Sequence, residues 1–397
     1  MLNTKFSSWP LFSEQEAEAV KQVVLSNKVN YWTGSKCREF EQAFAEWTGA
    51  KHALAVANGT LALELAMHGL GIGAGDEVVI PPRTFMATAS SVVAVGATPI
   101  FADVDLNSQA LSAETIAPMI TNKTKAIIVV HLGGMPADMD GIMALAAQHN
   151  LYVIEDCAQA HGAKYKDRSV GTIGHIGAWS FCQDKIMTTG GEGGMVTTND
   201  QALWKKMWAY KDHGKSYDAV YNKKHPPGFR WLHETFGSNY RMTELQAAIG
   251  LIQLQRMTAW TAKRQHNAKL IDVAAANFKI VRKINIPNFV EYAAYKHYLF
   301  VNQQFLKHGW SRDRIVDEIN ALGVPCYQGS CSEIYLEKAF VKHSSLPNQR
   351  LPNAKQLGES SLMFLVHPTL TEQEMKKTCG AIEQVLAQAE VNAKEEV

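Results

Sequence analysis

The chain has 397 residues, of which 46% are hydrophobic and 19% are charged, and its formal net charge is +1. This length and composition predict a globular protein with one large domain and a smaller one, and they argue against nucleic acid or an anionic membrane as the main partner. The N-terminus lacks a signal-peptide pattern, no run reaches the roughly 20 apolar residues of a membrane span, and the six Cys residues show no metal-ligand spacing. We therefore expect a cytoplasmic protein without a metal site.

The first predicted helix follows residues 13–16, whose Ser-Glu-Gln-Glu sequence is a capping box. From about residue 51, helical stretches alternate with short apolar runs at residues 78–80, 126–130 and 151–154. Runs of this kind are typical of strands that are buried on both faces. The alternation predicts an α/β fold with a mainly parallel central sheet and helices on both faces.

Polar residues follow each of these strands directly, at residues 81–84, 131–134 and 156–161. Because ligands of such sheets bind beyond the carboxyl ends of the strands, we expect the three clusters to form one site. This expectation is geometric and holds whichever ligand binds.

The spacing of the predicted elements widens in the last third of the chain. A long helix follows Thr243, residues 311–322 predict another helix, and residues 371–374 form a second capping box before the last helix. We expect a large domain over residues 1–260 and a smaller C-terminal α+β domain over residues 261–397. The N-terminal helix is free to pack on the small domain.

Three features of the sequence have both an ordinary and a chemical interpretation. Lys185 lies in a polar stretch before the glycine-rich residues 190–194, Asp156 ends a predicted strand, and residues 58–60 (Asn-Gly-Thr) precede an apolar helix. Taken singly, a Lys is usually a surface residue, an Asp a cap or turn former, and Asn-Gly-Thr a turn. Their occurrence together near predicted strand ends favours the chemical interpretation.

Together these features supply what pyridoxal 5′-phosphate (PLP) requires of a protein. The cofactor aldehyde forms a Schiff base with a lysine amine, for which Lys185 is the candidate. The pyridine nitrogen must stay protonated for the ring to accept electrons, and Asp156 is the candidate acid. Free amides at a helix N-terminus, here after Asn58, and a hydroxyl such as that of Ser180 suit the phosphate.

Five ordered motifs closely resemble those of the DegT-type nucleotide-sugar aminotransferases, which are PLP-dependent enzymes of fold type I, the aspartate-aminotransferase fold. The resemblance runs over nearly the whole chain. It is strongest at residues 58–63, 84–88, 155–162, 180–185 with 190–194, and 237–242.

The resemblance implies roles for individual residues. Lys185 forms the Schiff base and later moves a proton between cofactor and substrate carbons, while Asp156 pairs with the pyridinium nitrogen. Asn239 is expected to reach the phosphate of the neighbouring subunit's cofactor, which makes the active unit a homodimer with two shared sites. The remaining implied cofactor contacts are Gln159 (ring oxygen), Phe85 (ring face), and Gly59, Thr60 and Ser180 (phosphate).

The sequence departs from the family pattern beside two of these residues. Residues 182–184 (Cys-Gln-Asp) are an uncommon filling before Lys185, and the effect of an acid at position 184 depends on where its side chain points. Cys157 lies beside Asp156, where many relatives have a small apolar residue, and we expect it to be a packed thiol.

On the substrate side, the resemblance implies transfer of an amino group from glutamate or glutamine to a keto-sugar linked to a nucleoside diphosphate. The product is an amino-deoxy sugar nucleotide for polysaccharide synthesis. Trp32, Lys215 and Arg241 are candidate contacts, since cations suit a diphosphate and aromatic rings suit a base or sugar. The interpretation of Lys215 as an ordinary loop residue stays open, as does that of His131 as a satisfied histidine at a strand end.

Two other functions fit the same fold. Relatives that dehydrate sugars characteristically carry histidine in place of the lysine, and a catalytically silent PLP-binding scaffold should lack Lys185 or Asp156. Both residues are present, so the sequence favours an aminotransferase over a sugar dehydratase or lyase and over a silent scaffold.

Overall fold

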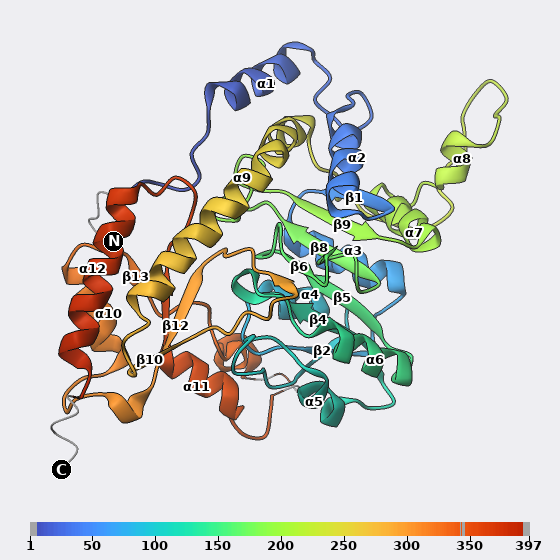
Figure 1. The fold of residues 1–397 in the computed structure, drawn as a ribbon. Coiled ribbons are helices and arrows are strands. Elements are labelled where there is room, and N and C mark those ends of the chain that lie inside the picture. Colours follow the sequence, from blue (N-terminus) through green and yellow to red (C-terminus); the bar gives the residue numbers. More distant parts are fainter. Residues whose placement is uncertain (1–5, 342, 344–345, 392–397) are drawn as a thin grey trace.

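A seven-stranded sheet forms the centre of the structure, a computed structural model that describes residues 6–341, 343 and 346–391 (Figure 1). In spatial order its strands are β1 (His52–Val56), β9 (Gly194–Thr198), β8 (Ile176–Ser180), β5 (Tyr152–Asp156), β4 (Thr124–Val130), β2 (Glu77–Ile80) and β3 (Thr98–Phe101). Neighbours pair in parallel from β8 across to β3, and β9 runs antiparallel to both β1 and β8. This confirms the predicted mainly parallel α/β sheet.

Helices cover both faces of the sheet because alternate residues along each strand point to opposite sides. Val78 and Ile80 join one core with α3, α4 and α7, whereas Val79 joins another core with α5 and α6. A third core forms where α2 packs beside β1, β8 and β9. The bounds of these helices are α2 (Lys36–Thr48), α3 (Gly59–Leu70), α4 (Ala87–Ala94), α5 (Ala113–Ile116), α6 (Met139–His149) and α7 (Gln201–Lys211).

A second, antiparallel sheet is built from the C-terminal part of the chain. Its strands in spatial order are β10 (Val281–Lys283), β12 (His297–Val301), β14 (Ser361–Phe364) and β13 (Cys326–Tyr327). The helices beside it are α10 (Arg312–Ala321), α11 (Pro352–Ser360) and α12 (Glu372–Ala389), and α12 begins at the predicted capping box. A small third sheet contains β11 (Val290–Glu291), β6 (Lys164–Tyr165) and β7 (Arg168–Ser169), and the short 3-10 helices lie at Ala117–Met119, Leu132–Gly134, Gln303–Phe305, Ile334–Leu336 and Lys338–Phe340.

The helix α9 (Glu244–Ala274) is continuous over 31 residues and connects the two parts of the molecule. Its first half contributes Leu254 and Met257 to a core shared with the large sheet, and its second half contributes Ile271 to the core of the C-terminal sheet. The predicted boundary after residue 260 falls inside this helix and stays a prediction.

The N-terminal segment runs from α12 past one side of α9 to α1 (Figure 1). The helix α1 (Glu14–Leu25) begins at the predicted capping box and packs on α9, where Arg256 Nη1 lies 3.0 Å from Glu16 Oε2. Before it, Ser7 Oγ donates to Glu374 on α12 at 3.0 Å. We call residues 6–12 the N-terminal strap.

The helix α8 (Tyr217–Tyr221) and the chain that follows it project from the body of the molecule, at the upper right of Figure 1. Within the described ranges, no helix combines the length and the apolar character that crossing a membrane requires.

Candidate functional site

Seven of the eight predicted cofactor residues line one cavity of about 650 Å³ beyond the carboxyl ends of the central strands. Two of the three polar clusters that follow strands contribute to its wall, and the third, at residues 131–134, lies behind it. The lining includes eight residues that matter to the chemistry: Gly59, Thr60, Phe85, Thr88, Asp156, Gln159, Ser180 and Lys185.

Asp156 forms the acidic end of the cavity. It is the last residue of β5, and its Oδ1 accepts the amide of Ala158 at 3.1 Å while its Oδ2 accepts the hydroxyl of Thr88 at 3.1 Å. Burial raises the pKa of this carboxyl, although both hydrogen bonds and the charge of Lys185 oppose the shift. A cation held against Asp156 would remove the cost of ionising it, so the site fits a protonated ring nitrogen.

Gln159 has an orientation that its surroundings determine. Its Oε1 accepts the amide of Gly133 at 2.8 Å. The side-chain amide nitrogen is therefore left to donate, and Gln159 lines the cavity. A donor at this point suits a negatively charged or carbonyl oxygen on a bound ring.

The start of α3 forms a cradle beside Ser180. Asn58 caps this helix by accepting the amide of Leu61 at 2.9 Å, so the amides of Gly59 and Thr60 are left for a ligand. A Cβ atom added at Gly59 would lie 2.6 Å from the Cβ of Ser180. Only glycine permits this close approach of the helix to the end of β8, and the arrangement fits a phosphate group.

Lys185 lines the same cavity as the acid and the cradle. Its Nζ is 3.7 Å from Asp184 Oδ1 and 5.3 Å from the centre of the Tyr295 ring. Asp184 also accepts the hydroxyl of Tyr295. Burial alone would raise the pKa of Asp184, but Lys185 and Tyr295 outweigh it and lower that pKa. The acid next to the lysine thus points toward it as a carboxylate.

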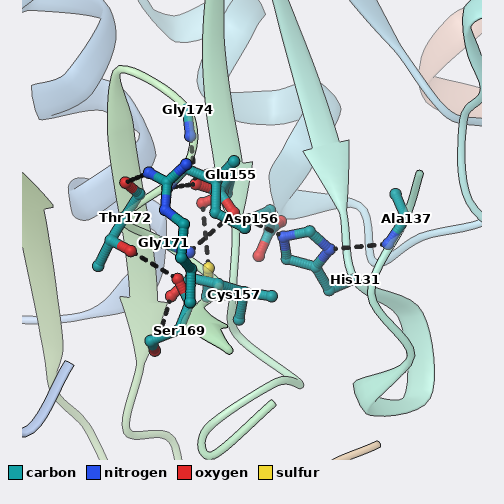
Figure 2. Close-up of polar contacts among 12 residues, drawn as sticks. His131, Ala137, Glu155, Asp156, Cys157, Ser169, Gly171, Thr172 and Gly174 are labelled. Carbon is teal, nitrogen blue, oxygen red and sulfur yellow. Dashed lines mark hydrogen bonds and ion pairs between the residues drawn. The ribbon is translucent and has the colours of Figure 1, made fainter. Parts of the chain in front are cut away.

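A buried pair lies behind Asp156 (Figure 2). His131 Nε2 and Glu155 Oε2 are 3.0 Å apart, and neither side chain is exposed. His131 Nδ1 accepts the amide of Ala137, so Nε2 carries the proton and donates to Glu155. His131 is therefore a satisfied histidine at a strand end, one of the two interpretations left open. Cys157 is buried, and burial raises the pKa of its thiol well above the usual range, as expected for a packed thiol.

Asn239 and the three predicted substrate contacts are not among the residues that line the cavity. Phe85 lines it but is 71% exposed, and Asn239 is exposed on the surface. The three predicted substrate contacts meet at a different residue, the fully buried Asp212. It accepts hydrogen bonds from Trp32 Nε1 at 2.7 Å, Lys215 Nζ at 2.8 Å and Arg241 Nη1 at 2.9 Å.

Two features of the site were missed in the sequence. Thr88, which donates to Asp156, lies in the 84–88 motif, and the four-residue spacing of Thr84 and Thr88, whose hydroxyls are 2.8 Å apart, was the available signal. The pairing of His131 with Glu155 had no local signal, since 24 residues separate the partners.

Comparisons with known proteins agree with this geometry. The model of the DegT/DnrJ/EryC1/StrS aminotransferase family matches residues 10–383. The chain is 37% identical to GDP-perosamine synthase of Caulobacter vibrioides over 88% of this chain and 89% of that one. It is 36% identical to the UDP-N-acetyl-3-dehydro-alpha-D-glucosamine 3-aminotransferase of Acidithiobacillus ferrooxidans over 89% of each. The crystal structure of an aminotransferase from Psychrobacter cryohalolentis superposes with a TM-score of 0.95 at 62% identity, covering 96% of this chain and 99% of that one.

Proposed function

Because the chain belongs to the DegT/DnrJ/EryC1/StrS aminotransferase family and is a PLP-dependent transaminase, we propose that it aminates a keto-sugar linked to a nucleoside diphosphate. The amino donor is glutamate or glutamine, and the product is an amino-deoxy sugar nucleotide. One observation carries the proposal: Lys185, Asp156 and the cradle of Gly59 and Ser180 line the same cavity.

Each predicted cofactor residue that lines the cavity has a task in this reaction. PLP, when bound, supplies an electron sink for the carbon that loses its proton. Asp156 would keep the ring nitrogen protonated, and Lys185 would hold the cofactor covalently and then carry the proton between carbon atoms. The residues that position the cofactor are Gln159 at the ring oxygen, Phe85 on the ring face, and Gly59, Thr60 and Ser180 at the phosphate.

The substrate class is supported by the relatives. The Caulobacter protein is named for a GDP-linked amino sugar, and the Acidithiobacillus protein for a UDP-linked keto-sugar. These names share a sugar nucleotide and differ in the base. We therefore propose the class of substrate, with Trp32, Lys215 and Arg241 as contacts, and a cytoplasmic enzyme whose product enters polysaccharide synthesis.

We also propose that the enzyme is a homodimer with shared active sites. The supporting observation is a set of large apolar side chains that one chain leaves exposed: Phe85 at 71%, Phe229 at 78%, Trp231 at 85% and Phe236 at 100%. The last three follow α8 in the sequence. The rings of Phe229 and Trp231 contact each other at 4.9 Å, and an exposed apolar cluster of this kind fits an interaction surface. In the proposed dimer, Asn239 would lie at the partner's cavity.

An absorbance experiment tests the function. The PLP-loaded enzyme should absorb in the visible range, lose this band when glutamate is added, and regain it with a keto-sugar nucleotide. Lys185→Arg should show neither change. Colour that glutamate leaves unchanged would point to a silent scaffold, and a dehydrated sugar without an amine would point to a dehydratase.

A further inference from the structure

Arg264 on α9 is a buried cation that pairs with no carboxylate in the described part of the chain. It is 1% exposed, and Nη1 donates to the carbonyl of Tyr295 at 3.3 Å. Its Nε and Nη2 have no hydrogen-bond partner among the residues that the structure describes. Burial lowers the pKa of Arg264 to about 9, so the side chain is charged at neutral pH. A guanidinium held this way is costly unless something else pairs with it.

The unpaired atoms of Arg264 lie on one edge of the guanidinium. Nε and Nη2 point their hydrogens in parallel, and this edge forms two simultaneous hydrogen bonds with a carboxylate. Both atoms are buried. A planar, negatively charged group can pair with both of them at once, which a single water molecule does less well.

Two more cations, Lys296 and Lys185, lie close to the ring of Tyr295. Lys296 Nζ lies 4.9 Å from the centre of the Tyr295 ring, on which Lys185 Nζ also lies at 5.3 Å. Burial lowers the pKa of Lys296 to about 8, which leaves it mostly protonated at neutral pH. Among the charged groups around Tyr295, Asp184 is the single acid within hydrogen-bond reach in the described part of the chain.

The histidines near these cations add no charge. Burial first, and then the charge of Arg264, lower the pKa of His367 to about 3. Burial and the charges of Lys185 and Arg264 do the same for His161. With both rings neutral, the surroundings of Tyr295 carry an excess of positive charge.

The N-terminal strap covers this cluster. The ring of Trp9 lies 4.9 Å from the Arg264 guanidinium, and its Nε1 donates to the carbonyl of Lys185 at 2.7 Å. The strap is attached to the C-terminal part through Ser7 and Glu374. One side chain thus contacts both the buried cation and the backbone of the lysine at the reaction centre.

We propose that Arg264 and Lys296 bind a carboxylate of the amino-acid donor, beneath Trp9. This inference rests on the proposed function, since it assigns a site to the donor of that reaction. A nucleoside diphosphate is the other anion of the reaction, but a small planar carboxylate fits the enclosed edge of Arg264 better. The donor is also the substrate that must lie next to Lys185.

Binding of glutarate, a dicarboxylate without an amino group, tests the site. The PLP-loaded enzyme is titrated with glutarate while its visible absorbance and its inhibition by glutarate are measured. We expect Lys296→Gln and Arg264→Lys each to raise the glutarate Kd roughly 10- to 100-fold, the scale of one charge-assisted hydrogen bond. Lys269→Gln, at an exposed position on the same helix, is the matched control and should bind glutarate like the wild type.

A second binding experiment distinguishes a carboxylate site from a nucleoside diphosphate site. UDP and GDP should bind the Arg264 and Lys296 variants as they bind the wild type. Loss of nucleotide affinity with unchanged glutarate affinity would assign the cations to the nucleotide and overturn the inference. Folded, coloured variants with wild-type glutarate affinity would overturn it too. If Arg264→Lys fails to fold, the glutarate affinity of Lys296→Gln, a variant at a half-buried position, still tests the inference.

The same assays distinguish this site from the proposed function. An enzyme that is bleached by glutamate and aminates no keto-sugar nucleotide would contradict the proposed acceptor and leave the donor site standing. An enzyme that aminates such sugars, and whose Lys296→Gln variant binds glutarate normally, would contradict the donor site alone.

Discussion

Gly59 and Ser180 lie so close that a Cβ atom at Gly59 would be 2.6 Å from the Ser180 Cβ and 3.0 Å from its hydroxyl. This contact joins the start of α3 to the end of β8 and fixes the width of the predicted phosphate cradle. We predict that Gly59→Ala forces the two elements apart at a cost of about 1–3 kcal/mol, with a roughly 10- to 100-fold loss of PLP affinity. The fraction of PLP that the variant retains after dialysis measures this loss of affinity.

Two further variants control this prediction. Gly380→Ala adds a Cβ to a helical glycine with nothing within 4 Å, so it should leave PLP affinity unchanged. Ser180→Gly in the Gly59→Ala background removes the colliding atom and should restore part of the affinity. A Gly59→Ala enzyme that keeps PLP as tightly as the wild type would show that the cradle can widen freely.

Gln159 should act as a hydrogen-bond donor to the cofactor. Glutamate at this position can still accept the Gly133 amide but cannot donate, and it places a negative charge near the ring oxygen. We expect Gln159→Glu to weaken PLP binding about tenfold or more, the scale of one lost hydrogen bond plus repulsion. Gln159→Ala should weaken it as well. Normal PLP binding by Gln159→Glu, measured by absorbance titration, would mean that only the contact with Gly133 matters.

The pair of His131 and Glu155 should contribute to stability in a pH-dependent way. Glu155 also accepts the amides of Gly171, Ile173 and Gly174. Burial would raise the pKa of Glu155, but these hydrogen bonds and His131 lower it below the ordinary value of 4.5. Its stabilisation is therefore present above about pH 4.5 and is lost as the pH falls through the lowered pKa.

We predict that Glu155→Gln lowers the free energy of unfolding by about 3 kcal/mol at pH 7, because four donors lose a carboxylate. Urea denaturation of the wild type and the variant should show this difference shrinking as the pH falls below 4.5. Glu383→Gln, at an exposed position on α12, is the control and should change little. A difference that stays constant down to acidic pH would contradict the assigned charge.

Shared active sites predict complementation between two defective variants. Lys185→Ala removes the amine from its own site, and Asn239→Asp places a negative charge at the phosphate in the partner's site. Refolding a 1:1 mixture should recover about a quarter of the wild-type activity, because half of the dimers are mixed and each has one intact site. Activity no greater than the sum of the separate variants would contradict the shared site, and size-exclusion chromatography with light scattering checks the dimer itself.

Local patterns allowed much of the fold to be predicted. The capping boxes at Ser13 and Thr371 depend on hydrogen bonds between residues three apart, so a short stretch of sequence contains the whole signal. The same holds for the buried strands that end near Asp156 and for the glycines after Lys185. These elements sufficed to place the acid and the lysine in one cavity.

Contacts between distant segments could not be predicted in this way. Trp9 meets Lys185 across 176 residues, and no periodicity near either one indicates the contact. The continuity of α9 past residue 260 depends on two different cores that hold its two halves, which is a property of the tertiary structure. Arg264 resembles any helical arginine until the segments that bury it are known.

Asp212 competes with any bound anion for the predicted substrate contacts. Its single carboxylate already holds Trp32, Lys215 and Arg241. An anion that binds Lys215 or Arg241 must displace this carboxylate from the cation. The binding free energy is therefore the difference between the new ion pair and the ion pair with Asp212. A ligand with a single weak charge gains little from the exchange, whereas a diphosphate can engage both cations at once. The residues around Asp212 would thus favour ligands that carry several negative charges close together.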